Sequence, residues 1–244
     1  IVTGVMNGIA SLFSSDAGAT PPGQINTGPI DNLIEWIGSK DAGATGFEAL
    51  NTVFCMKTAH GLDLTKMTVA QVMAKQPEWS DWTRRNKSKC NIVSHATGKF
   101  QAMHDSLQEA LNSGVIKKSD LFDERTQNKF GFWAGTIKAG RRKLANNFTE
   151  ARNAWKAGKL SYYEYALKRS AYHNSLSNEW RAIKTSNDQQ VGGQGYVSSK
   201  DMAAAMDQLP LFSAALAKDS PGVASKLTLP FELAGTAAVA QATA

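Results

Sequence analysis

The sequence predicts a mainly α-helical domain with a small β-element, on the evidence of two contrasting patterns. Apolar residues recur at helical spacing in several stretches, beginning with Ile30, Leu33, Ile34 and Ile37. Residues 39–66 instead are interrupted by glycines and hold β-branched residues in short bursts, which favours a loop or a small β-lobe. The expected class is therefore mainly α (α+β), with a helical lobe, a small β-element and one principal domain.

The helical stretches can be placed in order along the chain. Pro29 suits the first position of the first helix, and Gly38 lies near its end. Thr68 can cap a second helix that runs to about Lys75, while the polar and basic residues 76–94 are predicted to be irregular. Further helices are predicted at 100–113, 123–145, 149–156, 161–183 and 199–208.

Composition divides the chain into three parts. Residues 1–28 are rich in Gly, Ser, Ala and Thr, as is typical of a flexible arm or linker. Residues 29–208 carry the helical pattern and form the predicted domain, and residues 209–244 are predicted to be an Ala-rich C-terminal tail that packs on a partner. Because the chain starts at Ile1 without a Met, we expect a processed product or a piece of a larger protein.

The overall composition excludes several functional classes. The 244 residues are 42% hydrophobic and 20% charged, as in an ordinary globular protein. No apolar run reaches the roughly 18 residues that a membrane span needs. The two cysteines, Cys55 and Cys90, and the four histidines show no ligand spacing, so we expect neither a metal nor a cofactor. Whether the cysteines pair stays open.

The formal net charge of +6 is concentrated in two clusters. They are Arg84, Arg85, Lys87 and Lys89, and Lys138, Arg141, Arg142 and Lys143. Each cluster alone is most simply a solvated face. Together they suit a polyanion, which includes nucleic acid, anionic lipid and the bacterial cell wall, and charge does not choose among these.

Four segments, in a fixed order, carry a resemblance to a known family. They are residues 33–41 (LIEWIGSKD) with 46–51 (GFEALN), 64–73 (LTKMTVAQVM), 94–101 (SHATGKFQ), and 176–183 (LSNEWRAI) with 193–196 (GQGY). In order and spacing these segments resemble the phage lambda-type endolysins and their tail-associated relatives, which are lysozyme-like lytic transglycosylases.

The resemblance implies a lysozyme-like fold with a cleft between the helical lobe and the β-element. It also implies an enzyme that cleaves the bond between N-acetylmuramic acid and N-acetylglucosamine in peptidoglycan strands, with one carboxylic acid and no metal. The flanks suggest a virion protein, from the tail or ejected, that acts in the host periplasm and cell wall and contacts other virion proteins through its termini. Nucleic acid is not an expected partner, and no membrane span is expected.

The resemblance also implies site residues. Asp41 occupies the position of the family's catalytic Glu but is one methylene shorter, and a misplacement of ~1 Å can cost on the order of 100-fold in rate. Glu48 is the alternative acid; Glu35, on the same helix, is expected to be a solvated residue. The implied substrate-binding residues are Gly98, Phe100, Gln101 and Tyr196, although Phe100 also suits a core position.

Two other functions stay open at this point. The short Asp41 side chain also fits a structural virion protein that keeps a lysozyme-like fold without activity. The two basic clusters fit a nucleic-acid-binding protein, whose binding would be steeply salt-dependent.

Overall fold

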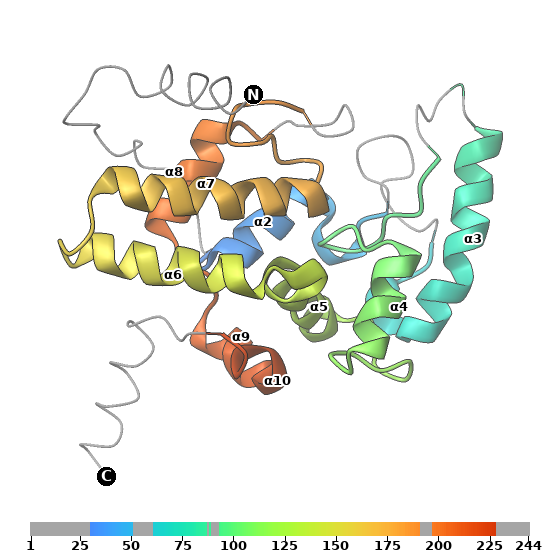
Figure 1. Cartoon of the computed structure of the whole chain (residues 1–244). Helices are drawn as coiled ribbons and strands as arrows, with labels where there is room; N and C mark the ends of the chain where they lie inside the picture. Colours follow the sequence, from blue (N-terminus) through green and yellow to red (C-terminus); the bar gives the residue numbers. More distant parts are fainter. Residues whose placement is uncertain (1–29, 51–60, 87, 89–92, 191–196, 228–244) are drawn as a thin grey trace, which may run out of the picture.

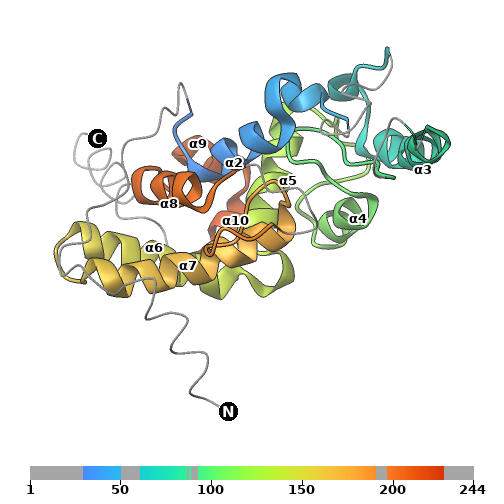
Figure 2. The same cartoon turned by 90° about the horizontal axis from the view of Figure 1, so that it is seen from above.

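The computed structural model describes residues 30–50, 61–86, 88, 93–190 and 197–227. In these residues, α-helices and the segments that connect them pack around one core (Figure 1). Helices α2 (Leu33–Ala42) and α5 (Glu124–Thr136) lie in the middle. On one side of them are α3 (Val69–Arg85) and α4 (His104–Asn112). On the other side are α6 (Arg142–Lys156), α7 (Tyr162–Glu179) and α8 (Ser199–Gln208), with α6 and α7 side by side (Figure 2). The mainly helical class is confirmed.

Short elements connect these helices. Short 3-10 segments lie at η1 (Gly43–Glu48), which is kinked at Gly46, η2 (Leu64–Lys66) and η3 (Lys138–Gly140). Within the described ranges, extended pairing is limited to isolated bridges such as Leu50 with Thr97. The β-element and the cleft beside it therefore stay predictions. None of the described helices is long and apolar enough to cross a membrane.

Side-chain caps explain where several helices begin. The Oδ1 of Asn32 accepts a hydrogen bond from the Glu35 amide at 3.0 Å, so α2 starts at Leu33 and not at Pro29 as predicted. Thr68 forms a capping box with Gln71 and starts α3, as expected. The predicted helix 199–208 is confirmed as α8.

Two predicted boundaries in the middle of the chain are wrong. Helix α3 continues through Pro77 to Arg85, because its buried face carries on past Lys75 with Trp79 and Thr83. The predicted helix 123–145 is broken after α5, where Ala139 and Gly140 adopt φ angles of 54° and 74°. This left-handed pair ends one helix and lets α6 begin in a new direction, and α6 also takes in the predicted helix 149–156.

The packed part of the chain continues past the predicted boundary at Gln208. The Leu33 amide donates to the Pro210 carbonyl at 2.8 Å, and the Phe212 ring lies 4.6 Å from the Phe132 ring. Two further helices, α9 (Ala214–Asp219) and α10 (Pro221–Ala224), pack against α5. Because apolar residues there cover α5, residues 209–227 belong to the domain and are not a tail. The rest of the predicted tail and the arm 1–28 lie outside the described residues.

Candidate active site

Asp41 lies at the end of α2, where the helix meets η1. The helix stops because Gly43 takes a φ of 60° and its amide donates back to the Ser39 carbonyl. Asp41 is only 7% exposed, so the helix end presents its carboxyl to the interior. The C-terminal end of a helix carries partial negative charge, which disfavours an ionised carboxylate there.

Burial raises the pKa of Asp41 to about 7, and the negative charge of Glu179 acts in the same direction. An ordinary aspartic acid is fully ionised at neutral pH. The carboxyl of Asp41 instead keeps its proton over much of the range in which proteins work. Asp41 therefore has the property that a general acid requires.

Glu179 is the last residue of α7 and is held by two cations. Its Oε1 accepts from Lys138 Nζ at 2.8 Å, and its Oε2 accepts from Arg141 Nη2 at 2.9 Å. Arg141 also donates to the Ala134 carbonyl and, at 2.9 Å, to the Ser175 hydroxyl. Both oxygens of Glu179 are thus committed to ion pairs at the end of the helix.

Glu48 is bound to the backbone at the start of η2. Its two carboxylate oxygens accept from the amides of Leu64 at 2.6 Å and Thr65 at 3.1 Å. A carboxylate that satisfies two amides orders the chain around it. This arrangement favours a structural role for Glu48 over a catalytic one.

The turn at Gly98 is fixed by Gln127 of α5. The Gln127 Oε1 accepts from the Lys99 amide at 2.7 Å, and its Nε2 donates to the carbonyls of Phe47 at 3.0 Å and Phe122 at 2.7 Å. Gly98 has a φ of 73°, and a β-carbon there would collide with the Gln127 side chain. Only glycine fits this close approach, so Gly98 shapes the turn.

Phe100 is 3% exposed and lies inside the core. Its ring fills the space beside two glycines, Gly38 of α2 and Gly131 of α5, and lies 6.1 Å from the Trp180 ring. A buried ring cannot stack on a sugar. Phe100 therefore belongs to the core, and the predicted binding role does not fit its position.

Gln101 closes the same turn. It takes a φ of 44°, and both its amide and its Nε2 donate to the Gly98 carbonyl, at 3.0 Å and 2.9 Å. Behind the turn, the fully buried Gln76 of α3 donates from its Nε2 to the Ala102 carbonyl at 2.9 Å. Gln101 is partly exposed, so a ligand can reach it, but its Nε2 already serves the turn.

His95, next to this turn, links α3 to α4. Its Nε2 accepts from the His104 amide at 3.2 Å, so its Nδ1 carries the proton and donates to Ser80 Oγ at 2.6 Å. Burial lowers the pKa of His95. These contacts hold the start of α4 in place, which is a structural task.

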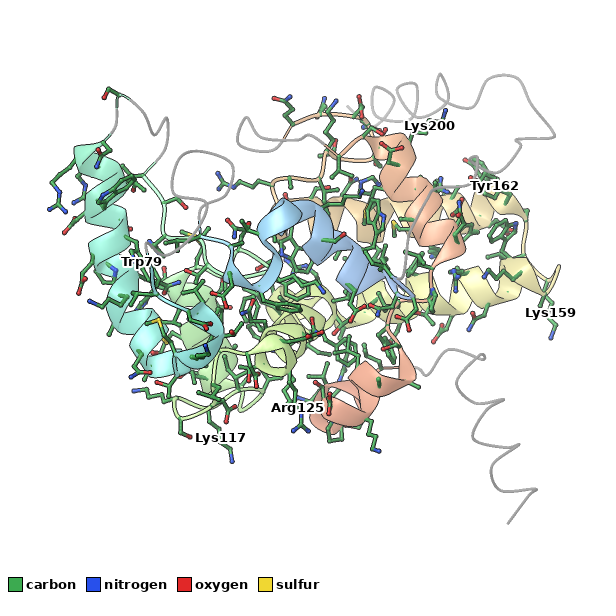
Figure 3. The ribbon with its side chains drawn as sticks, turned by 180° about the vertical axis from the view of Figure 1, so that it is seen from behind. Trp79, Lys117, Arg125, Lys159, Tyr162 and Lys200 are labelled. Atoms are coloured by element: carbon green, nitrogen blue, oxygen red, sulfur yellow. The ribbon has the colours of Figure 1, made fainter. Side chains whose placement is uncertain are left out.

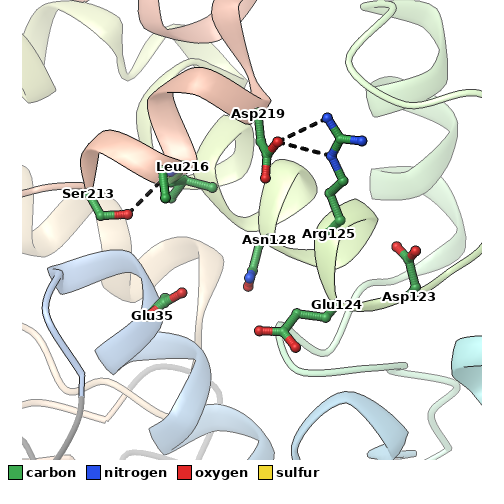
Figure 4. Close-up of a pocket in the computed structure, with 9 residues that line it drawn as sticks. Glu35, Asp123, Glu124, Arg125, Asn128, Ser213, Leu216 and Asp219 are labelled. Carbon is green, nitrogen blue, oxygen red and sulfur yellow. Dashed lines mark hydrogen bonds and ion pairs between the residues drawn. The ribbon is translucent and has the colours of Figure 1, made fainter.

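Glu35, the other carboxylic acid of α2, lies in a separate, open pocket of about 540 Å³. This pocket lies between α2, the start of α5 and α9, and Asp219 and Arg125 form an ion pair on its wall (Figure 4). Its lining also includes Asp123, Glu124 and Asn128. The buried Asp41 is not part of this lining, so Glu35 and Asp41 serve different surfaces.

The second basic cluster is not a continuous cationic surface. Lys138 and Arg141 are directed into the protein and paired with Glu179, while Arg142 and Lys143 are exposed. The lysines that project outward in Figure 3 are instead spread over the molecule, as Lys117, Lys159 and Lys200 show. Half of the predicted cluster is therefore unable to contact a polyanion.

The structure packs the Phe100 ring against Gly38 of α2, the helix that also carries Asp41, and places Gly98 and Gln101 in the turn that carries Phe100. Tyr196, Cys55 and Cys90 lie outside the described part of the chain. Glu179 lies in one of the four resembling segments, but the sequence gave no reason to assign it a role. Its partners, Lys138 and Arg141, are about 40 residues away in the chain, and no spacing rule connects residues that far apart. Comparisons of the chain with models of protein families, with curated protein sequences and with solved structures found no match.

Proposed function

We propose that this protein cleaves peptidoglycan, breaking the bond between N-acetylmuramic acid and N-acetylglucosamine with Asp41 as the general acid. The observation that carries the proposal is the buried carboxyl of Asp41, whose pKa is raised to about 7. The resemblance of the four sequence segments supplies the substrate class. The same resemblance and the composition of the flanks support a phage virion protein that acts at the host cell wall.

The proposed reaction needs one carboxyl group. The protonated Asp41 gives its proton to the glycosidic oxygen as the bond from that oxygen to C1 of the muramyl sugar breaks. The resulting carboxylate takes the proton of the muramyl C6 hydroxyl as its oxygen bonds to C1, which returns Asp41 to its acid form. The product is a 1,6-anhydro sugar, and no water is consumed.

The roles of the neighbouring residues follow from their contacts. Gly98 and Gln101 form the turn that carries Phe100, whose ring packs on the helix of Asp41, and we assign the Gln101 amide to an N-acetyl group of the substrate. Glu48 and Phe100 support the backbone around the site. Both oxygens of Glu179 are engaged by cations, so this carboxylate does not act as a nucleophile or as a base for water.

The test is the release of dye-labelled fragments from purified sacculi by the wild type and by Asp41→Asn. We expect a loss of at least about 100-fold in Asp41→Asn, because an amide cannot deliver the proton. Asp31→Asn is the matched control, since Asp31 is an exposed aspartate beside the start of the same helix and is expected to keep full activity.

Two outcomes would contradict the proposal. If the wild type releases no fragments, the protein is better described as a structural virion protein with an inactive site. If Asp41→Asn is as active as the wild type, the acid is another residue.

A further inference from the structure

The imidazole ring of His95 links α3 to the start of α4. Its two nitrogens are bound by different helices: Nδ1 by the Ser80 hydroxyl of α3 at 2.6 Å, and Nε2 by the His104 amide of α4 at 3.2 Å. The backbone of His95 is held as well, because its carbonyl accepts from the Thr97 hydroxyl at 2.6 Å. The ring is thus a fixed contact between the two helices.

Helix α4 depends on this ring at its first residue. The first amides of an α-helix have no partner within the helix and are usually satisfied by a side-chain oxygen at the cap position. The cap position of α4 is Met103, whose side chain accepts no hydrogen bond from these amides. The amide of His104 instead donates to the lone pair of His95 Nε2. His95 therefore supplies a cap from outside the helix.

This cap requires a neutral imidazole. Because a backbone amide can only donate, Nε2 must carry a lone pair, and the single proton of the ring lies on Nδ1. A second proton on Nε2 would point at the His104 N–H, so that two donors would face each other. It would also place a positive charge at the N-terminus of a helix, which disfavours cations. A protonated His95 is therefore incompatible with the present start of α4.

The charged groups around the ring do not remove this conflict. Burial lowers the pKa of His95, and the neighbouring His104 acts in the same direction. Asp105 acts in the opposite direction, but its side chain is fully exposed to water. On α3, the charged residues on either side of Ser80 form ion pairs with each other. These pairs are Lys75 with Glu78 and Asp81 with Arg84.

The first turn of α4 also carries a contact to a distant part of the fold. Ser106 Oγ accepts from Lys138 Nζ at 2.6 Å, and the same lysine binds Glu179 at the end of α7. Farther along α4, Leu107 and Ala110 are fully buried. Loss of the cap should therefore loosen the first turn and its bond to Lys138, while the buried face keeps the rest of the helix in place.

We propose that His95 is a pH-sensitive cap that releases the first turn of α4 in mild acid. Imidazole is the side chain whose charge changes closest to neutral pH, so a modest acidification is enough to operate it. The inference does not depend on the proposed function, because it concerns the conformation of the protein without substrate.

The test measures hydrogen exchange of the backbone amides of residues 104–106 by NMR, expressed as protection factors so that the pH dependence of the chemical exchange cancels. The ¹⁵N shifts of the His95 ring, titrated in the same samples, show when the ring is protonated. Protection of these amides should fall about tenfold as the ring gains its proton, because a cap is lost and a cation faces the helix N-terminus. Amides in the middle of α5 should keep their protection.

Two variants make the test specific. His95→Gln offers an oxygen in place of Nε2 and cannot be protonated, so protection of residues 104–106 should not change with pH. Asp41 still titrates in this variant, and its contribution is thereby separated from that of His95. The control is His104→Gln, which should keep the loss of protection and shift it to higher pH, because His104 lowers the pKa of His95.

Two results would overturn the proposal. One is unchanged protection of residues 104–106 in the wild type after the His95 ring has become protonated. The other is a loss of protection in His95→Gln as large as that in the wild type. If His95→Gln does not fold, the wild-type measurement alone decides.

Discussion

Asp41 combines a buried position with a place in the last turn of α2, at the negative end of the helix. The fold keeps this carboxyl out of water, and the neighbouring Glu179 adds a like charge. Both effects favour the protonated form. The acid that we propose, although one methylene shorter than the glutamate of the resembling family, is therefore in the protonation state that the proposed first step requires.

The first prediction at the residue scale concerns pH. Because the acid must be protonated when substrate binds, kcat/KM should fall as pH rises through about 7, the pKa of Asp41. Initial rates of fragment release between about pH 3 and about pH 9 would measure this limb. A fall centred near the ordinary aspartate pKa of 3.8 would contradict the assignment.

The second prediction concerns stability. The pKa of Asp41 is about 7 in the fold, whereas an aspartate in water has a pKa of 3.8, so the folded protein binds this proton more tightly than the unfolded chain does. The free energy of unfolding therefore falls as pH rises from about 4 to about 7. At pH 8, Asp41→Asn should be more stable than the wild type by up to about 4 kcal/mol.

Urea unfolding at two pH values measures this effect. The gain from Asp41→Asn should be large at pH 8 and small at pH 4, where the wild-type carboxyl is protonated too. Asp31→Asn serves as the control and should show little change at either pH. An equal effect of Asp41→Asn at both pH values would contradict the raised pKa.

Residues in a short recognisable segment can be singled out from the sequence, whereas residues whose partners are distant in the chain cannot. Asp41 and Gly98 stand in short segments whose resemblance is visible directly in the sequence. Glu179, Lys138 and Arg141 meet only in the folded chain. In the sequence, the two cations looked like part of a surface cluster. Whether a charged side chain is buried depends on which elements pack over it, and this cannot be determined from a single sequence.

At the scale of elements, the turn at residues 97–102 is bound to three other parts of the fold. The Gly98 amide donates to the carbonyl of Ala49, the residue that follows η1, at 2.6 Å, and Gln127 binds the turn to α5. The turn is bound to α3 through Gln76. A small change in this turn therefore acts on three elements at once.

The prediction for this element uses two glycines with the same backbone angle. Gly98 and Gly114 both have a φ of 73°, but a β-carbon collides with Gln127 at Gly98 and meets nothing within 4 Å at Gly114. Gly98→Ala should lower the free energy of unfolding by about 2 kcal/mol more than Gly114→Ala. If urea unfolding gives the same loss of free energy of unfolding for both variants, the close contact with Gln127 does not affect stability.

Helix types were predicted well, but several helix ends were not. Strong caps at Thr68, Ser161 and Ser198 mark true starts, because a side-chain oxygen there accepts an amide hydrogen bond. The end of α3 was missed because residues 76–94 are polar and basic and were expected to be irregular, whereas the burial of Trp79 favours a continued helix. Tertiary packing outweighed local propensity at that point.

At the scale of the whole molecule, the segment after Gln208 completes the core. Its apolar residues cover α5, and the chain also bonds to the start of α2 through Pro210. Composition suggested a tail because the segment is rich in alanine. Its larger apolar residues, such as Phe212 and Leu216, are what bind it to the domain.

The prediction for this segment is a large loss of stability in Phe212→Ala. Phe212 is fully buried against Phe132, and deletion of such a ring costs about 3–5 kcal/mol. Tyr163→Ala is the control, because Tyr163 is 52% exposed and should change stability by less than about 0.5 kcal/mol. Equal thermal shifts for the two variants would mean that residues 209–227 do not belong to the core.

The most direct test of the whole account is the mass of the soluble fragments released from purified sacculi. The wild type should release fragments that end in a 1,6-anhydro sugar, lighter by one water than the products of hydrolysis, and Asp41→Asn should release none. If the wild type releases no fragments, or if Asp41→Asn releases the same fragments, Asp41 is not the acid of a peptidoglycan-cleaving enzyme.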